Sequence, residues 1–395
     1  MDIQFKKEIG KALSARTYAY VKKADRIQCM KTHEWDRAGE VKLIEDLVIQ
    51  VIRSTEVLFS MGAPSHVNKK YIREAIPGRN ILLCLKISIP DIKEHYPIHQ
   101  FNPYVDMFFR HVESRHLDEL PWMLEVLTDD ELVKWCGVLN DFIAAIRQEA
   151  KNPAFKKTMS EFTRLSNKNF RELRNYINAL FEQHSRLLVL RIDFGYLKEY
   201  GKRRATASVV EYGTVKKDWQ SLLLYLRRKL PHDCLLGFAW KLEYGLEKSF
   251  HYHVLLMLDG SKVREDVTIA RLIGDHWNET ITKGKGLYYN CNAFKEGYKF
   301  CGIGMINHSD MALREGLEKA ALYLTKPDYY IKLIAPDDGR TFGKGNMPKP
   351  RTGSRGRPRT KSVPKENNLE RGIPSPREGE ERGIPLTPEL HPINA

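Results

Sequence analysis

The sequence predicts an α+β protein in three parts: an all-helical domain at residues 1–165, an antiparallel-sheet domain at residues 180–335, and a disordered basic tail at residues 336–395. Three observations lead to this division. Apolar residues recur at helical spacing in the first part, strand and helix patterns alternate in the second, and the third is rich in Pro, Gly and Arg. The first part carries no chemical motif and is expected to be an accessory domain.

The helices of the first part are predicted from apolar residues three and four positions apart, which lie on one face of a helix. This spacing runs through residues 41–61 and again through residues 129–146. Ser166 is expected to cap a further helix, which carries Phe170 and Leu173 on its apolar face.

The second part mixes strand and helix patterns. Strands are predicted at residues 185–196, 235–245, 251–258 and 302–306, and helices at residues 214–230, 267–277 and 311–326. A short polar turn joins the second and third strands, which predicts a hairpin. This order of elements predicts helices packed on one antiparallel sheet.

The charge of the chain favours an anionic partner. Its 395 residues include 64 Lys and Arg against 50 Asp and Glu, a formal net charge of +14. Nucleic acid is preferred over a membrane, because the most apolar runs, such as residues 81–89, are too short to span a bilayer. The N-terminus lacks the apolar stretch of a signal peptide, and the six scattered cysteines include no CxxC pair, so we expect a cytoplasmic protein.

The most informative motif is Phe250-His251-Tyr252-His253 at the start of an apolar strand. Residues i and i+2 of a strand point to the same face, so His251 and His253 present two imidazoles side by side while Tyr252 packs on the opposite face. Neutral imidazoles bind divalent ions such as Mn²⁺ and Zn²⁺ well. Two histidines at this spacing are by themselves more often held by ordinary hydrogen bonds, so a metal site needs a third ligand.

Glu243 is the predicted third ligand. It lies near the end of the strand before the histidines, and the hairpin brings it beside them. Two histidines and one carboxylate leave coordination positions open for a phosphate oxygen, as a catalytic Mg²⁺ or Mn²⁺ site requires. Glu247 is the alternative ligand, although its place in the predicted turn favours a solvated side chain.

Tyr323 is the predicted nucleophile. It lies near the end of the last predicted helix, and Lys326 follows on the same face, three residues later. A phenol has a pKa of about 10 and becomes a good nucleophile only where a cation favours the phenolate, a role open to Lys326 or to Lys319. The alternative role of Tyr323 is packing. Tyr329 and Tyr330 are weaker candidates, with packing or DNA stacking as their expected roles.

Three segments, in this order, resemble the motifs of HUH replication initiators. They are SRLLVLRIDF at residues 185–194, WKLEYGLEKSFHYHVLL at residues 240–256, and YLTK at residues 323–326. The chain is most similar to inovirus-type replication endonucleases and to prophage-encoded YagK/YfjJ C-terminal-domain proteins, over residues 180–345. The resemblance implies that the sheet domain has the HUH endonuclease (Rep-like) fold.

The resemblance also implies an activity: nicking and joining of single-stranded DNA in rolling-circle-type replication of a phage, prophage or plasmid-like element. His251 and His253 would hold the metal. Tyr323, with its lysine at Lys326, would form a 5′-phosphotyrosine link and free a 3′-hydroxyl. No second tyrosine lies four residues from Tyr323, so a one-tyrosine mechanism is expected. Host replication helicase or polymerase would be a further partner.

We expect two further features of the sequence to support the metal site or to contact DNA. Asp193 and Arg191 share a face of the first strand, where they would support the metal site, contact DNA or pair with each other. Residues 355–358, RGRP, resemble the core of an AT-hook, with a generic basic linker as the alternative. The tail is expected to raise affinity for DNA without setting sequence specificity.

Two other functions fit the same residues. A non-catalytic DNA-binding regulator built on this domain would use only the sheet and the basic tail. A metal-dependent phosphoesterase without a covalent step would use the histidines and would not need Tyr323.

Overall fold

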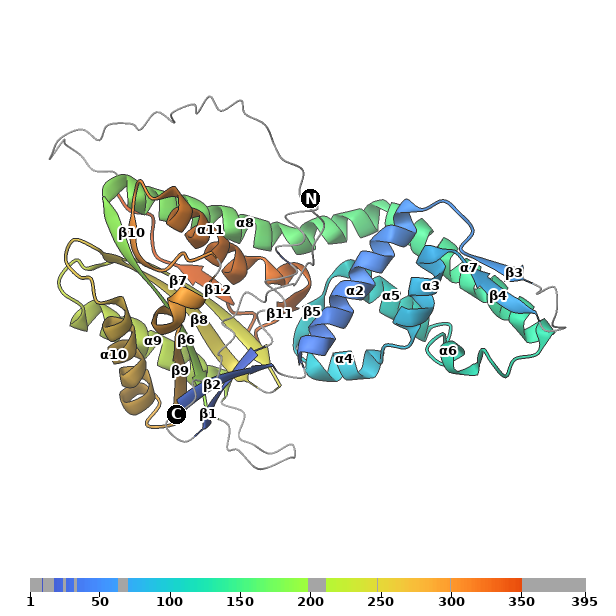
Figure 1. Cartoon of the computed structure of the whole chain (residues 1–395), viewed down its shortest axis with the longest axis horizontal. Helices are drawn as coiled ribbons and strands as arrows, with labels where there is room; N and C mark the ends of the chain where they lie inside the picture. The colour runs from blue at the N-terminus through green and yellow to red at the C-terminus, as the bar shows by residue number, and fades with distance from the viewer. Residues whose placement is uncertain are drawn as a thin grey trace, which may run out of the picture.

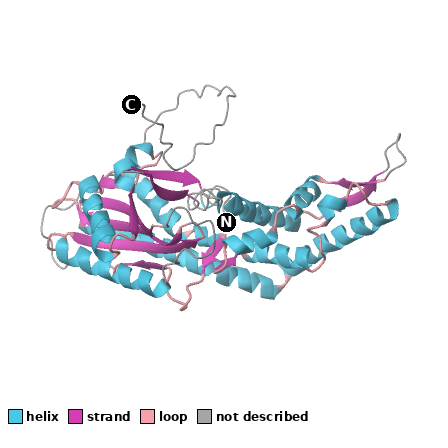
Figure 2. Ribbon diagram, turned by 90° about the horizontal axis from the view of Figure 1, so that it is seen from below, coloured by secondary structure: helices cyan, strands magenta, loops and turns pink. Residues whose placement is uncertain are grey.

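The computed structural model describes Ile9 and residues 18–23, 26–31, 34–62, 70–197, 211–246, 248–298 and 300–349. The molecule is elongated, with a sheet-containing part at one end and a mainly helical part at the other (Figure 1). Seen from below, the long strands all lie in the sheet-containing part (Figure 2). Within the described residues, no helix combines the length and the apolar character needed to cross a membrane.

The mainly helical part also contains strands. Its helices are α2 (Glu34–Arg53), α3 (Ile76–Leu85), α4 (Ile89–His95), α5 (Pro103–Glu113), α6 (Leu120–Met123), α7 (Asp129–Lys151) and the start of α8 (Pro153–Gln183). Among these helices, β3 (Phe59–Gly62) pairs with β4 (Tyr71–Glu74), while β1 (Tyr18–Lys23), earlier in the chain, pairs with β2 (Arg26–Lys31) and is drawn at the sheet-containing end in Figure 1. The N-terminal part is thus helical, as expected, but it is not all-helical.

The helix expected at residues 41–61 ends at Arg53, where two side chains donate to one carbonyl of its last turn. The Ser54 hydroxyl and the Arg147 Nε both donate to the Val51 carbonyl, at 3.2 and 3.1 Å. The chain then turns into β3, which begins at the buried Phe59. Because Phe59 joins the same core as the residues of α2, its spacing resembled a continued helix.

Ser166 does not cap a helix, in contrast to the expectation. α8 begins after Asn152, whose side-chain oxygen accepts from the backbone N–H two residues later. Ser166 lies buried in the middle of α8, and its hydroxyl donates to the Thr163 carbonyl at 3.2 Å. Phe155 packs in the core of the helical part, whereas Leu173 packs against the sheet. α8 is thus shared by both parts of the molecule (Figure 1).

The sheet is antiparallel and has the strand order β10-β6-β8-β7-β12, with β9 beside the second half of β6. Its strands are β6 (Arg186–Tyr196), β7 (Leu235–Gly245), β8 (Ser249–Asp259), β9 (Gly286–Asn290), β10 (Gly304–Asn307) and β12 (Phe342–Lys344). The helices of this part are α9 (Tyr212–Lys229), α10 (Asp266–His276) and α11 (Met311–Thr325), with the turns η1 (Trp277–Ile281), η2 (Cys291–Gly297) and η3 (Pro327–Tyr329). The predicted strands, hairpin and helices are confirmed, while β9, β12 and the short turns were not predicted.

The alternation of side chains along the strands creates two packed faces. On one face, Tyr252 stacks on Trp219 of α9 with ring centroids 4.9 Å apart, in a core shared with α10. On the other face, Leu255 and Met257 pack under α8 and α11. α11 therefore covers the face of β8 that carries His251 and His253, and Tyr252 lies on the other face.

The predicted tail begins later than expected. Residues 342–344 form β12, which pairs with β7 and completes the edge of the sheet, and the described chain continues to residue 349. The expectation that the tail starts at residue 336 is wrong, because Thr341 and the residues after it supply hydrogen bonds to β7. The basic segment at residues 350–361, with its AT-hook-like RGRP, lies outside the described residues.

The segment after α11 docks into the helical part. The Tyr329 hydroxyl donates to the buried Glu45 at 2.7 Å, and Asn102 donates to the Tyr329 carbonyl from its side chain and to the Tyr330 carbonyl from its backbone, both at 2.9 Å. β11 (Ile331–Leu333) then pairs with β5 (His99–Phe101). Both tyrosines are buried, so the packing role expected for them is confirmed.

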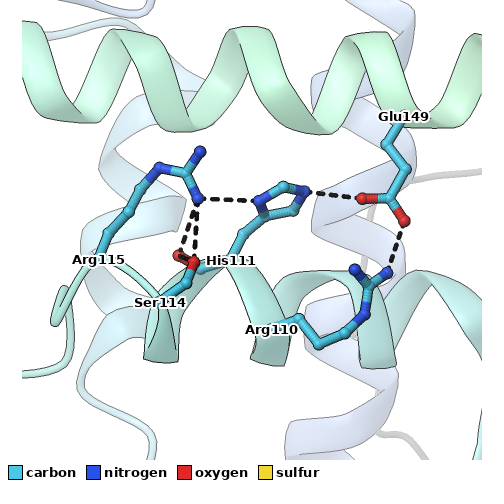
Figure 3. Close-up of polar contacts among 5 residues, drawn as sticks. All are labelled: Arg110, His111, Ser114, Arg115 and Glu149. Carbon is cyan, nitrogen blue, oxygen red and sulfur yellow. Dashed lines mark hydrogen bonds and ion pairs between the residues drawn. The ribbon is translucent and has the colours of Figure 1, made fainter.

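A polar cluster ties the C-terminal end of α5 to α7 (Figure 3). Glu149 of α7 contacts Arg110 at 2.5 Å and His111 at 2.9 Å, and Arg115 lies 2.9 Å from the other ring nitrogen of His111. Burial lowers the pKa of His111, against the opposing effect of Glu149. These contacts hold α5, and with it Asn102 at its N-terminus, in the position that receives the segment after α11.

Tyr329→Phe tests this docking. Removing the hydroxyl leaves buried Glu45 without the hydrogen bond at 2.7 Å, so the free energy of unfolding should fall by about 1.5–3 kcal/mol. Urea unfolding measures the change. Tyr71→Phe, at a tyrosine that is 42% exposed, should leave stability nearly unchanged. Equal stability of the two variants would show that the Tyr329–Glu45 contact does not hold the parts together.

Candidate metal centre and tyrosine helix

Strand register brings the predicted metal ligands together. In the β7–β8 hairpin Glu243 lies opposite His251, and Lys241 lies opposite His253. On the other side of β8, Asp193 of β6 lies opposite His253. Since directly opposed residues point to the same face, these five side chains form one polar patch within the apolar face under α8 and α11.

The distances in this patch fit a single cation. One ligand atom from each of Glu243, His251 and His253 lies within 4.8 Å of the others. The Glu243 Oε2 is 3.4 Å from the His253 Nε2 and 3.7 Å from the His251 Nε2. Ligands bound about 2.0–2.2 Å from one ion are roughly 3–3.6 Å apart, so little movement would place all three around a metal. The rival Glu247 lies outside the described residues.

The Nδ1 atom of each imidazole has a polar neighbour. The Nδ1 of His251 lies 3.0 Å from the Ser249 carbonyl, and the Nδ1 of His253 lies 2.7 Å from the Asp193 Oδ1. The Nδ1 of His251 thus has a carbonyl acceptor, the Nδ1 of His253 has a carboxylate in ion-pair contact, and each Nε2 is presented toward Glu243. Among the described residues, neither Nε2 atom has a hydrogen-bond partner. This pattern of oriented imidazoles with carbonyl or carboxylate support is typical of metal-binding histidines.

The pKa values of the two histidines are shifted in opposite directions. Burial lowers the pKa of His251. Burial acts in the same direction on His253, but the negative charges of Asp193 and Glu243 outweigh it and raise the pKa of His253. Burial also disfavours the carboxylate of Asp193, yet His253 and Arg191 hold the pKa of Asp193 at about 2. The Nε2 of His253 can thus carry either a proton or a cation, and the two compete.

Asp193 contacts both His253 and Arg191, so the pairing with Arg191 that was weighed from the sequence is confirmed. It lies 5% exposed between His253 and Arg191, whose Nε is 3.8 Å from the Asp193 Oδ1. It supports the imidazole at Nδ1 and pairs with Arg191 at the same time.

The helix with Tyr323 ends beside this patch. α11 packs on the sheet face that carries the histidines, and its approach is close where Gly302 meets Gly316: a Cβ on Gly302 would lie 2.1 Å from the Gly316 backbone. The Tyr323 hydroxyl is buried. Five residues after Tyr323, Asp328 reaches β7 and forms an ion pair with Lys241 at 2.6 Å.

Lys326 and Lys319 both contact residues outside α11. The Lys326 ammonium donates to the Asn167 side chain of α8 and lies 5.4 Å from the centre of the Phe170 ring. Burial lowers the pKa of Lys326 to about 8. Lys319 lies over the ring of Phe300, 3.2 Å from its centre. The lowered pKa of Lys326 suits a group that exchanges protons near neutral pH.

The Lys241–Asp328 ion pair was missed by sequence reasoning. Lys241 is fully buried, and its ammonium also donates to the Thr341 hydroxyl at 3.3 Å. The sequence feature that could have indicated a buried ion pair is the position of Lys241. It lies two residues before Glu243 on the inward face of an apolar strand, where an unpaired charge would be very unfavourable. Its partner follows the helix 87 residues later and could not be identified from spacing.

Comparison with known proteins identifies a family. The family model described as the YagK/YfjJ C-terminal domain matches residues 148–345, and because this is half of the chain, the protein belongs to that family. The match includes α8, the whole described sheet and α11. No curated protein and no solved structure matches the chain.

Metal binding is predicted to depend on both histidines and on pH. His251→Ala with His253→Ala should abolish Mn²⁺ binding in isothermal titration calorimetry, while His232→Ala, at an exposed histidine, should bind as the wild type does. Because a proton competes at the His253 Nε2, affinity should fall as the pH drops through the raised pKa of His253, which lies above 6.5. Undiminished affinity in the double variant would place the metal elsewhere.

Asp328→Asn is predicted to destabilise the protein strongly. It leaves the buried ammonium of Lys241 without its carboxylate, which costs about 3–5 kcal/mol at buried ion pairs. Replacing both partners, as Lys241→Met with Asp328→Leu, should recover most of this loss. Asp337→Asn, at the exposed partner of Lys216, is the control and should have a much smaller effect in urea unfolding. Equal effects of the two Asn variants would contradict a buried, coupled pair.

Proposed function

We propose that this member of the YagK/YfjJ C-terminal domain family nicks and rejoins single-stranded DNA with metal assistance, in rolling-circle-type replication of a prophage or related mobile element. Membership of a prophage-associated family supports the type of element. The formal charge of +14 supports DNA as the partner. Under this proposal the sheet domain has the HUH-type endonuclease fold and is related to inovirus replication proteins.

The observation that carries the proposal is the placement of an oriented metal-ligand set beside the end of a tyrosine helix. His251 and His253 direct their Nε2 atoms toward Glu243. Lys241 lies opposite His253 in the hairpin. Through its ion pair with Asp328, it holds the segment that follows the helix of Tyr323. Structural metal sites usually have four protein ligands, whereas three leave room for substrate.

In the proposed reaction Tyr323 attacks a phosphodiester of single-stranded DNA. The phenol loses its proton, a new bond joins its oxygen to phosphorus, and the bond from phosphorus to the 3′ oxygen breaks. The products are a 5′-phosphotyrosine link and a 3′-hydroxyl, which receives a proton and can prime synthesis or reverse the step. A bound cation would polarise the phosphate, and two imidazoles with one carboxylate suit Mn²⁺ better than Mg²⁺.

The residues around the imidazoles and the phenol have separate roles in this scheme. Asp193 and the Ser249 carbonyl hold the imidazoles by their Nδ1 atoms. Lys326, with its pKa near 8, can take the phenolic proton or stabilise the phenolate once it leaves Asn167. Because the Tyr323 hydroxyl is buried, we expect DNA binding to move the chain that covers it.

Tyr323→Phe tests the chemistry. The wild type, incubated with Mn²⁺ and a randomised pool of single-stranded oligonucleotides, should form a covalent adduct that survives denaturing electrophoresis. The Phe variant should keep its stability and its Mn²⁺ affinity but form at least a thousandfold less adduct, because only the attacking oxygen is lost. Tyr225→Phe, on the opposite face of the sheet, is the matched control and should react as the wild type does.

Each other outcome selects an alternative. An adduct with Tyr323→Phe that disappears with Tyr330→Phe would move the nucleophile into the docked segment. Cleavage without an adduct in both proteins would indicate a metal-dependent phosphoesterase. DNA binding without cleavage would indicate a regulator built on the same domain.

A further inference from the structure

The outer side of α8 carries a continuous basic and amide surface, which we call the α8 face. It consists of exposed residues from four successive turns: Arg164, Asn167, Lys168, Arg171, Arg174, Asn175 and Asn178. They lie opposite the buried side of the helix, where Leu173 packs on the sheet. The one acidic residue of α8 between positions 164 and 178 is the half-buried Glu172.

Much of this positive charge is not neutralised. Glu172 lies 3.7 Å from Lys168, a loose surface pair, and Glu318 of α11 lies 3.4 Å from Arg174. Among the described residues, Arg164 and Arg171 have no ion-pair partner. Like charges three and four residues apart repel each other on a helix, so this sequence weakens α8 unless an anion lies across it.

The α8 face continues to the tyrosine helix. Asn167 accepts from the Lys326 ammonium at one end, and Asn178 accepts from Arg314 of α11 at 3.0 Å at the other. The two helices lie side by side in Figure 1, with the sheet beneath them. A DNA segment lying on the α8 face would therefore lie beside the helix that carries Tyr323.

We propose that the α8 face binds the phosphate backbone of duplex DNA next to the strand that is nicked. The inference rests on the proposed function for DNA as the partner, but not on the covalent chemistry. From residue 164 to residue 178 a helix rises about 21 Å, roughly six base pairs of duplex at 3.4 Å each. Arginine and amide side chains are common phosphate contacts.

Duplex DNA fits this surface better than a single strand. Sites for single strands combine basic residues with exposed aromatic rings on which bases stack. The exposed residues of the α8 face include no aromatic ring, and the nearby Phe170 is half-buried beneath the cations of Lys326 and Arg174. The α8 face would thus hold the flanking duplex, while the strand to be cut reaches the metal centre.

The test compares two triple variants with the same change in charge. Arg164→Gln, Lys168→Gln and Arg171→Gln remove three charges from the α8 face. Arg227→Gln, Arg228→Gln and Lys229→Gln remove three exposed charges from the last turn of α9, on the other side of the sheet. Binding of a 30-base-pair duplex and of a 30-nucleotide single strand is measured without metal, from 50 to 200 mM salt, with the full-length chain.

The α8 variant should lose at least tenfold in duplex affinity at 100 mM salt. The slope of log affinity against log salt should become shallower by up to about 2.7, or 0.9 for each lost phosphate contact. The α9 variant should bind within threefold of the wild type. Equal losses in both variants would show an effect of net charge alone and would overturn the proposal, as would an α8 variant that binds duplex like the wild type.

The remaining arms separate this inference from the proposed function. The α8 variant should still form the covalent adduct with single-stranded oligonucleotides, so its loss would be confined to duplex binding. Equal weakening of single-strand and duplex binding would overturn the assignment to duplex DNA. A wild type that binds neither DNA would overturn DNA as the partner, and with it the proposed function.

Discussion

The buried ion pair between Lys241 and Asp328 determines how the candidate centre is assembled. Both charges lie out of contact with water, where neither is tolerated without the other. The pair therefore exists only when the end of α11 is docked on β7. Lys241 lies opposite His253 and two residues before Glu243, so this contact, together with the packing of α11 on the sheet, positions the tyrosine helix relative to the metal ligands. Such a pair contributes geometry more than stability.

The same short segment also joins the two parts of the molecule. Asp328 reaches the sheet, and the next residue, Tyr329, reaches Glu45 in the helical core. α8 repeats this connection on a larger scale, because one end packs in the helical core and the other on the sheet. A partner that moves the helical part would thus move the tyrosine helix. The N-terminal part is in this sense a component of the site's geometry and not only an appended domain.

Local patterns predicted the sheet well and the connections poorly. Alternation and a short turn were enough to place His251, His253 and Glu243 on one face, because strand register follows directly from the hairpin. The α2–β3 boundary was misplaced because Phe59 packs in the same core as the helix before it. Ser166 resembled a cap, but Asn152 had already started the helix. Asp328 and Glu45 are linked to their partners by tertiary contacts across 87 and 284 residues, which no local pattern encodes.

The central claim is that the chain forms a covalent link to DNA through one tyrosine beside a two-histidine metal centre. The most direct measurement is mass spectrometry of the adduct, digested with protease and nuclease after incubation with Mn²⁺. The expected product is a nucleotide 5′-phosphate attached to the peptide that contains Tyr323, the tyrosine of α11. A phosphate on any other residue, or DNA cleaved with no modified peptide, would contradict it.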